Sequence, residues 1–229
     1  KTGKSFLVLQ MALAVASGSP FLGFRTTKGP VLYCALEDSR SRLSKRISLL
    51  ADDERDVLEN LYLLNEMRGL DGEGLPVLSE WMSLHKPRLV VVDTWGKAKP
   101  SGDSRKNAYE RDVEIVSEVK RLADRHECSV LLVHHEKKGG SRENDWLESL
   151  SGSMGLTATV DGILSLKRGR GENRGVLRRS GRDFEEDSDL ALTWKEPGWE
   201  CLGDASEVFL SEERRRILQT VRDAGEPVS

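Results

Sequence analysis

The sequence has little net charge, few cysteines and no long apolar run. Its 229 residues carry a net charge of −3, so no global basic field attracts nucleic acid, and any such binding must come from a local patch. The three cysteines are far apart and lack metal-ligand spacing, which favours a reducing compartment, the cytoplasm, and buried apolar roles for all three. The longest apolar run, residues 6–16, is too short to span a bilayer, so we expect no membrane association.

What is present begins at the first residue, with Lys1-Thr2-Gly3-Lys4-Ser5. Gly-Lys-Ser before a helix-like run is the last third of a phosphate-binding loop, G-x-x-x-x-G-K-[ST], in which backbone N–H groups and the helix N-terminus hold phosphates. Lys4 would reach the β- and γ-phosphates of ATP, and the Ser5 hydroxyl would bind Mg²⁺. The first glycine of the motif and the strand before it would precede Lys1, so we expect this sequence to be a fragment. The expected ATP-binding segment is Lys1, Thr2, Gly3, Lys4, Ser5 and Phe6.

Three apolar runs of strand length end in acidic or imidazole side chains. They are residues 31–36 before Glu37-Asp38, residues 89–92 before Asp93, and residues 129–133 before His134-His135. Continuous apolar runs are typical of parallel strands covered on both faces, and open α/β folds place their chemistry at the carboxyl ends of such strands. An apolar strand that ends in aspartate has the form of a Walker B strand, whose acid reaches the Mg²⁺ shell. Combined with Gly-Lys-Ser, this strand predicts nucleotide binding more specifically than either part does.

The rest of the chain completes an α/β prediction. We expect helices at residues 6–17, 40–50, 75–85 and 109–126, a short strand at 62–64, polar loops at 96–107 and 137–144, and a fourth strand at 160–166. Short antiparallel strands are expected at 176–178, 190–194 and 199–202, and Ser211 is expected to cap a last helix that ends near Ala224. The predicted fold is a mainly parallel sheet flanked by helices. We divide it into an ATPase core, residues 1–205, and a C-terminal helical segment, residues 206–229, as the start of a winged helix.

The segments KTGKS, VLYCALEDS, RLVVVDTW, SVLLVHH and SGSMGLTATVD occur in this order. With them, the sequence resembles the RecA-like, P-loop ATPase core of hexameric replicative helicases, most closely the RepA type and related phage and mobile-element AAA ATPases, with the DnaB type more distant. The resemblance covers residues 1 to about 168. It implies a hexameric, Mg²⁺-dependent ATPase that moves on single-stranded DNA in replication, with a replication initiator or a primase as a further partner candidate.

The resemblance also implies roles for individual residues. Glu37 would activate the attacking water and Asp93 would order Mg²⁺, while His135 would sense the γ-phosphate. For Glu37 the alternative is a helix-capping acid that pairs with Arg40 or Arg42, and for His135 it is a side chain that only fills space. Arg42 would pack on the adenine and so join the ATP-binding set, although a solvated helix face is an equal alternative.

Two further sets of cations follow from the resemblance. The polar loops resemble those that line the DNA channel of RecA-like rings, and their lysines would contact the phosphate backbone of the DNA. For each lysine, an ordinary exposed surface position is the alternative. RepA-type enzymes carry an arginine finger shortly after the aspartate that matches Asp161, where this chain has Ile163 and Leu164, so a later cation would have to complete the neighbouring subunit's site. The DNA-binding candidates are Lys97, Lys99, Lys137 and Lys138, and the finger candidates are Lys167, Arg168 and Arg170.

Two other functions remain open. One is a RecA-like ATPase of recombination or repair that binds DNA without unwinding it. The other is a regulatory nucleotide-binding protein that assembles with protein partners and hydrolyses slowly. DNA-stimulated ATP hydrolysis would separate the regulatory protein from the two DNA-dependent enzymes.

Overall fold

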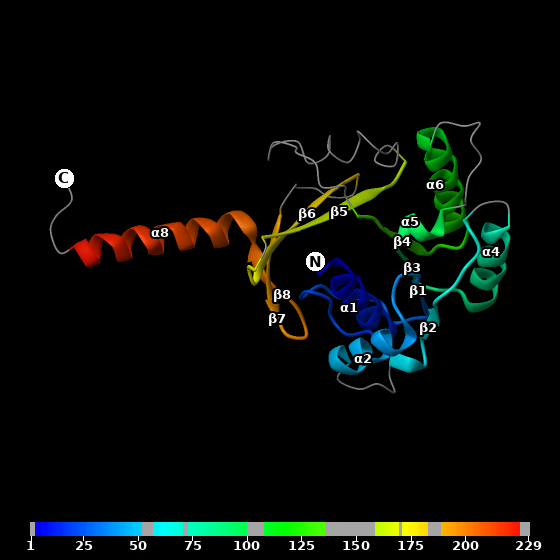
Figure 1. Cartoon of the computed structure of the whole chain (residues 1–229), viewed down its shortest axis with the longest axis horizontal. Helices are drawn as coiled ribbons and strands as arrows, with labels where there is room; N and C mark the ends of the chain where they lie inside the picture. Colours follow the sequence, from blue (N-terminus) through cyan, green and yellow to red (C-terminus); the bar gives the residue numbers. More distant parts are fainter. Residues whose placement is uncertain are drawn as a thin grey trace. The chain divides into compact units, whose positions relative to one another are not determined.

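The computed structural model describes residues 3–51, 57–70, 73–99, 108–135, 159–169, 171–182 and 189–224 (Figure 1). These residues form two compact units, the first ending at Asp161 and the second beginning at Gly162. The predicted division after residue 205 stays a prediction, because compactness alone does not show that a segment folds independently. Nowhere in the described ranges does a helix combine the length and the apolar character needed to cross a membrane.

The first unit is built on a parallel sheet in the order β2-β1-β3-β4. Its strands are β1 (Val31–Ala35), β2 (Leu61–Leu64), β3 (Leu89–Asp93) and β4 (Ser129–Val133). The central strands β1 and β3 are buried over their whole length, as the continuous apolar runs predict. In the register, Ala35 lies beside Asp93 and Asp93 beside Val133. The carboxyl ends of three strands therefore lie together at one edge of the sheet.

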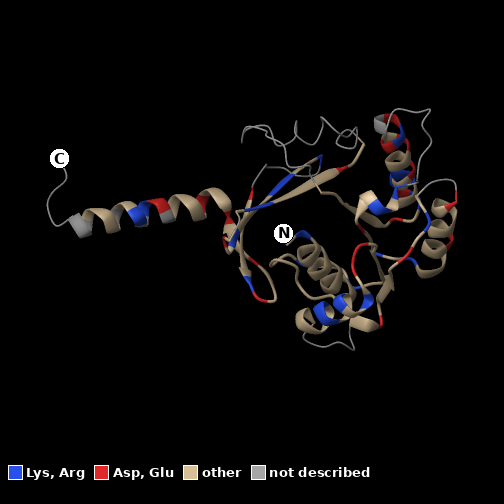
Figure 2. Ribbon diagram, viewed as in Figure 1, with Lys and Arg blue, Asp and Glu red and all other residues tan. Residues whose placement is uncertain are grey.

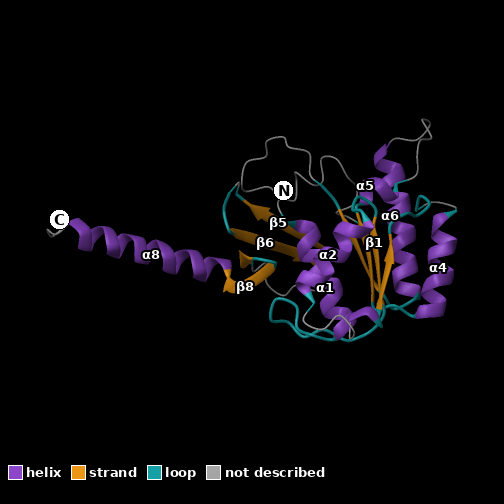
Figure 3. Ribbon diagram, turned by 60° about the horizontal axis from the view of Figure 1, so that its bottom comes forward, coloured by secondary structure: helices purple, strands orange, loops and turns teal. Residues whose placement is uncertain are grey.

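Helices cover both faces of this sheet (Figure 3). α1 and α2 pack with Val31, Tyr33 and Val91 on one face, whereas α4, α5 and α6 pack with Leu32 and Val90 on the other. Neighbouring residues of a strand point to opposite faces, which explains why β1 and β3 are apolar at every position before the carboxyl end of β3. The helices are α1 (Lys4–Ser17), α2 (Arg40–Leu50), α4 (Gly74–His85), α5 (Trp95–Ala98) and α6 (Ala108–Arg125).

Two glycines bound α1. Gly3 precedes the helix with a φ of 86°, and Gly18 ends it with a φ of 82° and donates its N–H to Ala14 O. Both conformations are left-handed, a region that side chains other than glycine rarely adopt. The predicted stop at Gly18 is confirmed, and the helix begins two residues before the predicted residue 6.

The second unit contains an antiparallel sheet in the order β5-β6-β7-β8. The expected antiparallel strands after residue 174 are therefore confirmed, and the expected strand at 160–166 joins this sheet as β5 instead of the parallel one. The elements are β5 (Gly162–Arg168), β6 (Arg174–Gly181), β7 (Leu190–Lys195), β8 (Gly198–Asp204) and α8 (Ala205–Ala224).

The start of α8 corrects the sequence prediction. The helix begins at Ala205, because Asp204 Oδ1 accepts from the backbone N–H groups of Ser206 and Glu207, at 2.8 and 3.3 Å. Ser211 lies within the helix, and its hydroxyl donates to Val208 O at 2.9 Å. The predicted cap at Ser211 is thus wrong, since the aspartate that ends β8 already satisfies the first N–H groups of the helix. The winged helix stays a prediction.

Candidate active site

The amino end of α1 lies at the carboxyl end of β4. The Lys4 ammonium donates to the backbone oxygen of His134 at 2.8 Å, which links the Gly-Lys-Ser segment directly to the edge where the predicted site residues gather. Lys1 and Thr2 lie outside the described residues. The ring of Phe6, expected in the ATP-binding set, is covered by the guanidinium of Arg46, whose Cζ lies 4.7 Å from the ring centre.

Asp93 is the buried acid of the site, with 5% of its surface exposed. Its Oδ2 accepts a hydrogen bond from the Tyr33 hydroxyl at 2.9 Å. Burial raises the pKa of Asp93, while hydrogen bonds from Tyr33 and from the Ser5 side chain favour the charged form and oppose that rise. The structure thus brings together Ser5 and Asp93, the two residues predicted to hold a metal.

These two residues fit Mg²⁺ by their chemistry. Asp93 Oδ1 is buried and has no hydrogen-bond partner, so one carboxylate oxygen is available as a ligand beside the Ser5 hydroxyl. Mg²⁺ prefers oxygen ligands and is usually held by one or two carboxylates together with waters and substrate phosphates. In the described part of the chain, no group of three or more His, Cys, Asp or Glu side chains is arranged to hold a metal on its own.

Glu37 lies beside Asp93 at the same edge. Its Oε1 accepts from the Thr94 hydroxyl at 2.8 Å, and its Oε2 lies 3.9 Å from Nε2 of His135. The Leu36 N–H donates to Asp93 O at 2.7 Å, which fixes the backbone just before Glu37. Of the alternative partners of Glu37, Arg42 pairs with Asp38, and the cap of α2 is Ser39.

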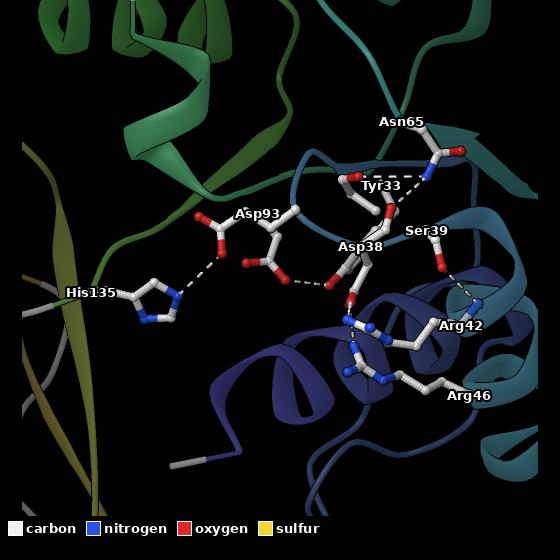
Figure 4. Close-up of polar contacts among 10 residues, drawn as sticks. Tyr33, Asp38, Ser39, Arg42, Arg46, Asn65, Asp93 and His135 are labelled. Atoms are coloured by element: carbon white, nitrogen blue, oxygen red, sulfur yellow. Dashed lines mark hydrogen bonds and ion pairs between the residues drawn. The ribbon is translucent and has the colours of Figure 1, made fainter. Parts of the chain in front are cut away.

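Asp38 anchors the segment that carries Glu37. Its carboxylate accepts from Arg42 at 3.0 Å and from Arg46, while its backbone oxygen accepts from the Asn65 side chain at 3.2 Å (Figure 4). The next residue, Ser39, caps α2 by accepting from the Arg42 N–H at 3.3 Å. We did not predict this arrangement, although arginines four and eight residues after an acid at a helix start were a signal for it.

The two arginines that hold Asp38 differ in exposure. The Arg42 side chain is 56% exposed, against 18% for Arg46. Arg42, expected to pack on the adenine, thus pairs with Asp38 on a cationic stretch of α2 that is visible in Figure 2. Its adenine contact stays a prediction.

The two histidines after β4 have different surroundings. Burial lowers the pKa of His134, and the nearby charges of Lys99 and Lys4 lower it further, so this imidazole is neutral at pH 7. His135 is 53% exposed and faces the Glu37 carboxylate. His135, which we preferred as the sensor, is therefore the histidine whose side chain contacts the candidate water-activating acid.

The predicted DNA-binding lysines have different environments. Lys97 is exposed on α5, a short helix that occupies the start of the segment predicted as a polar loop. Lys99 instead forms an ion pair with Asp112 of α6, which is 4% exposed, and its Nζ lies 5.5 Å from the centre of the Trp95 ring. Lys137 and Lys138 lie outside the described residues.

Arg168, a finger candidate, lies on β5 of the second unit. Its Cζ is 5.5 Å from the Trp194 ring centre and 5.2 Å from that of Trp199, and its Nε donates to Glu172 O at 2.5 Å. Lys167, the neighbouring candidate, is exposed on the same strand. Arg170 lies outside the described residues.

A comparison with protein families found a match to a large part of the chain. A family model described as "AAA domain" matches residues 1–141, more than half of the chain. The match includes the Gly-Lys-Ser segment and the ends of β1, β3 and β4, where Glu37, Asp93 and His135 lie. No curated protein matches the chain.

Proposed function

We propose, from the premise that this chain belongs to the AAA domain family, that it is an ATP-dependent DNA helicase or translocase of replication. Nucleotide binding and hydrolysis follow from the family. One observation supports the catalytic assignment. Side chains from the start of α1 and from the ends of β1 and β3 meet at one edge of the sheet, and these are Lys4, Ser5, Glu37 and Asp93.

The residues of this edge have complementary roles toward ATP. The Lys4 ammonium and the N–H groups at the start of α1 bind the phosphates, and the Ser5 hydroxyl and the Asp93 carboxylate hold Mg²⁺. Bound Mg²⁺ neutralises charge on the phosphate oxygens. Glu37 accepts the proton of the attacking water, and the Thr94 hydroxyl, 2.8 Å from Oε1, keeps this carboxylate in place.

His135 links this chemistry to the segment that follows it. Its Nε2 lies 3.9 Å from Glu37 Oε2, so a movement of Glu37 on hydrolysis would change the position favoured by His135. In the proposed translocase, this shift moves the following segment, which carries Lys137 and Lys138, along single-stranded DNA. Lys97, exposed three residues after Thr94, would contact the same strand.

Hydrolysis in this proposal takes place between the subunits of a hexamer. A cation from the next subunit, Lys167, Arg168 or Arg170, would neutralise charge in the transition state. A replication initiator or a primase would bring the hexamer to its DNA. The resemblance of residues 1–168 to RepA-type helicases supports these steps.

Replacing the proposed base tests the catalytic assignment. In Glu37→Gln we expect ATP binding to remain and turnover to fall about 100-fold or more, because the amide cannot accept the proton of water. Glu66→Gln, a change of an exposed glutamate after β2, is the matched control. Equal turnover in Glu37→Gln and the wild type would remove Glu37 from the mechanism.

The wider function is tested with the same protein on DNA. ATP-driven displacement of a strand from a forked duplex is the expected result for a helicase. ATP hydrolysis that is stimulated by single-stranded DNA, but without strand displacement, would favour the recombination or repair ATPase. ATP hydrolysis with no response to DNA would favour the regulatory protein.

A further inference from the structure

Tyr33 is a buried polar residue that the proposed mechanism does not use. It lies on β1 with 2% of its surface exposed, and its hydroxyl donates to Asp93 Oδ2 at 2.9 Å. The register places Ala35 beside Asp93, so Tyr33, two residues earlier, points to the same face of the sheet as Asp93. The phenol therefore extends along this face toward the edge where the candidate site lies.

The two oxygens of the Asp93 carboxylate have different contacts. Oδ2 accepts from the tyrosine hydroxyl, and Oδ1 is buried without a hydrogen-bond partner. The Ser5 side chain is near enough to lower the pKa of this carboxylate. A carboxylate that receives a hydrogen bond on one oxygen has a fixed orientation, and partners of this kind commonly orient metal ligands. Here the fixed orientation leaves Oδ1 as the oxygen that can reach a metal.

The tyrosine is suited to this task because it remains a donor. Its hydroxyl donates to Oδ2 of Asp93 at 2.9 Å, and a phenol keeps its proton at neutral pH. A phenylalanine would fill the same space in the core between α1 and β3. Packing alone therefore does not account for the hydroxyl.

We infer that Tyr33 is a positioning residue that holds Oδ2 of Asp93, presents Oδ1 to Mg²⁺ and so determines how strongly nucleotide binding depends on the metal. This inference rests on the proposed function of the same site. Tyr33 would affect only the part of nucleotide affinity that depends on Mg²⁺. The other part is independent of the metal, because Lys4 and the start of α1 bind the phosphates without the Asp93 carboxylate.

Tyr33→Phe removes the hydroxyl and keeps the ring. The affinity of a fluorescent ATP analogue is measured in EDTA and then over a Mg²⁺ titration. We expect the affinity in EDTA to stay within about twofold of the wild type, while the Mg²⁺ concentration for half-maximal enhancement rises about 10-fold, as is typical when a group behind a metal ligand is removed. Tyr62→Phe, a change on the neighbouring strand β2 where the tyrosine is 37% exposed, should match the wild type in both measurements.

The outcomes separate the inference from the proposed function. An unchanged Mg²⁺ requirement in Tyr33→Phe, or equal weakening of binding with and without Mg²⁺, would overturn the role of Tyr33 while leaving the ATPase intact. Wild-type protein without any Mg²⁺-dependent binding would overturn the proposed function itself. If Tyr33→Phe does not fold, 3-fluorotyrosine at position 33 serves as the second variant. Its stronger donor should lower the Mg²⁺ requirement, and an unchanged or raised requirement would contradict the inference.

Discussion

The two arginines that hold Asp38 allow a test of how burial determines the strength of an ion pair. Arg46 and Arg42 both donate to the same carboxylate, which is 15% exposed, but their own side chains are 18% and 56% exposed. Arg46 also lies over the Phe6 ring at 4.7 Å. Replacing each arginine in turn with methionine keeps much of the side-chain volume and removes the charge.

The expected losses of unfolding free energy differ severalfold. Breaking a fully buried pair by removing one partner costs about 3–5 kcal/mol, and the partial exposure of Arg46 reduces this to about 2 kcal/mol, with about 0.5 kcal/mol more from the lost contact with Phe6. Arg42→Met should cost about 0.5 kcal/mol or less, since exposed pairs are weak and screened by solvent.

Urea unfolding of the two variants measures this difference. The free energy of unfolding of each variant is taken from the same unfolding transition. The dependence of this free energy on urea concentration is also compared, because a change in this slope reveals a changed unfolded state. Arg46→Met is also expected to lower ATP turnover, because Asp38 directly follows Glu37. Equal destabilisation by the two substitutions, or a larger effect of Arg42→Met, would refute the argument from burial.

Two further predictions concern cations and pH. Lys99→Met should destabilise the first unit by about 2 kcal/mol, because it leaves the buried Asp112 carboxylate without its partner. Lys97→Met should instead weaken the binding of single-stranded DNA with little loss of stability. Urea unfolding and a DNA titration of both variants check these two expectations. The folded state lowers the pKa of His134, so the unfolded chain binds this proton more tightly and stability should fall as pH drops through about 6.5. His134→Gln should flatten that part of the stability profile, and an unchanged profile would contradict the assignment.

The positions of the strands and of the site edge could be predicted because they depend on local patterns. A strand covered on both faces needs an apolar residue at every position, and β1 and β3 have that pattern up to their last residues. Parallel pairing then brings the carboxyl ends together, so Glu37, Asp93 and His135 could be assigned to one edge without knowing their contacts. The Gly-Lys-Ser segment was recognisable from its residues alone, because the lysine and serine of this motif bind phosphate and Mg²⁺ at the start of a helix.

What could not be predicted depends on partners that are distant in the sequence. Tyr33 looks like one more large residue in an apolar strand, and only the pairing of β1 with β3 shows that its hydroxyl reaches Asp93, 60 residues away. Lys99 looks like an exposed cation of a polar loop, and only the packing of α6 supplies Asp112. The start of α8 was misplaced for a related reason, since the aspartate at the end of β8 caps the helix before Ser211 is reached.

The finger candidates show how the same limit affects a functional assignment. A cation that completes a neighbouring subunit's site must extend away from its own sheet, yet the Arg168 guanidinium lies over two tryptophan rings and donates to Glu172 O. Leaving these rings would cost about 0.5–2 kcal/mol for each contact. Lys167, the preceding residue on β5, points to the opposite face by strand alternation and is exposed. In the proposed hexamer, Arg168 would have to give up these contacts to act on another subunit, whereas Lys167 lies exposed on the other face of its strand.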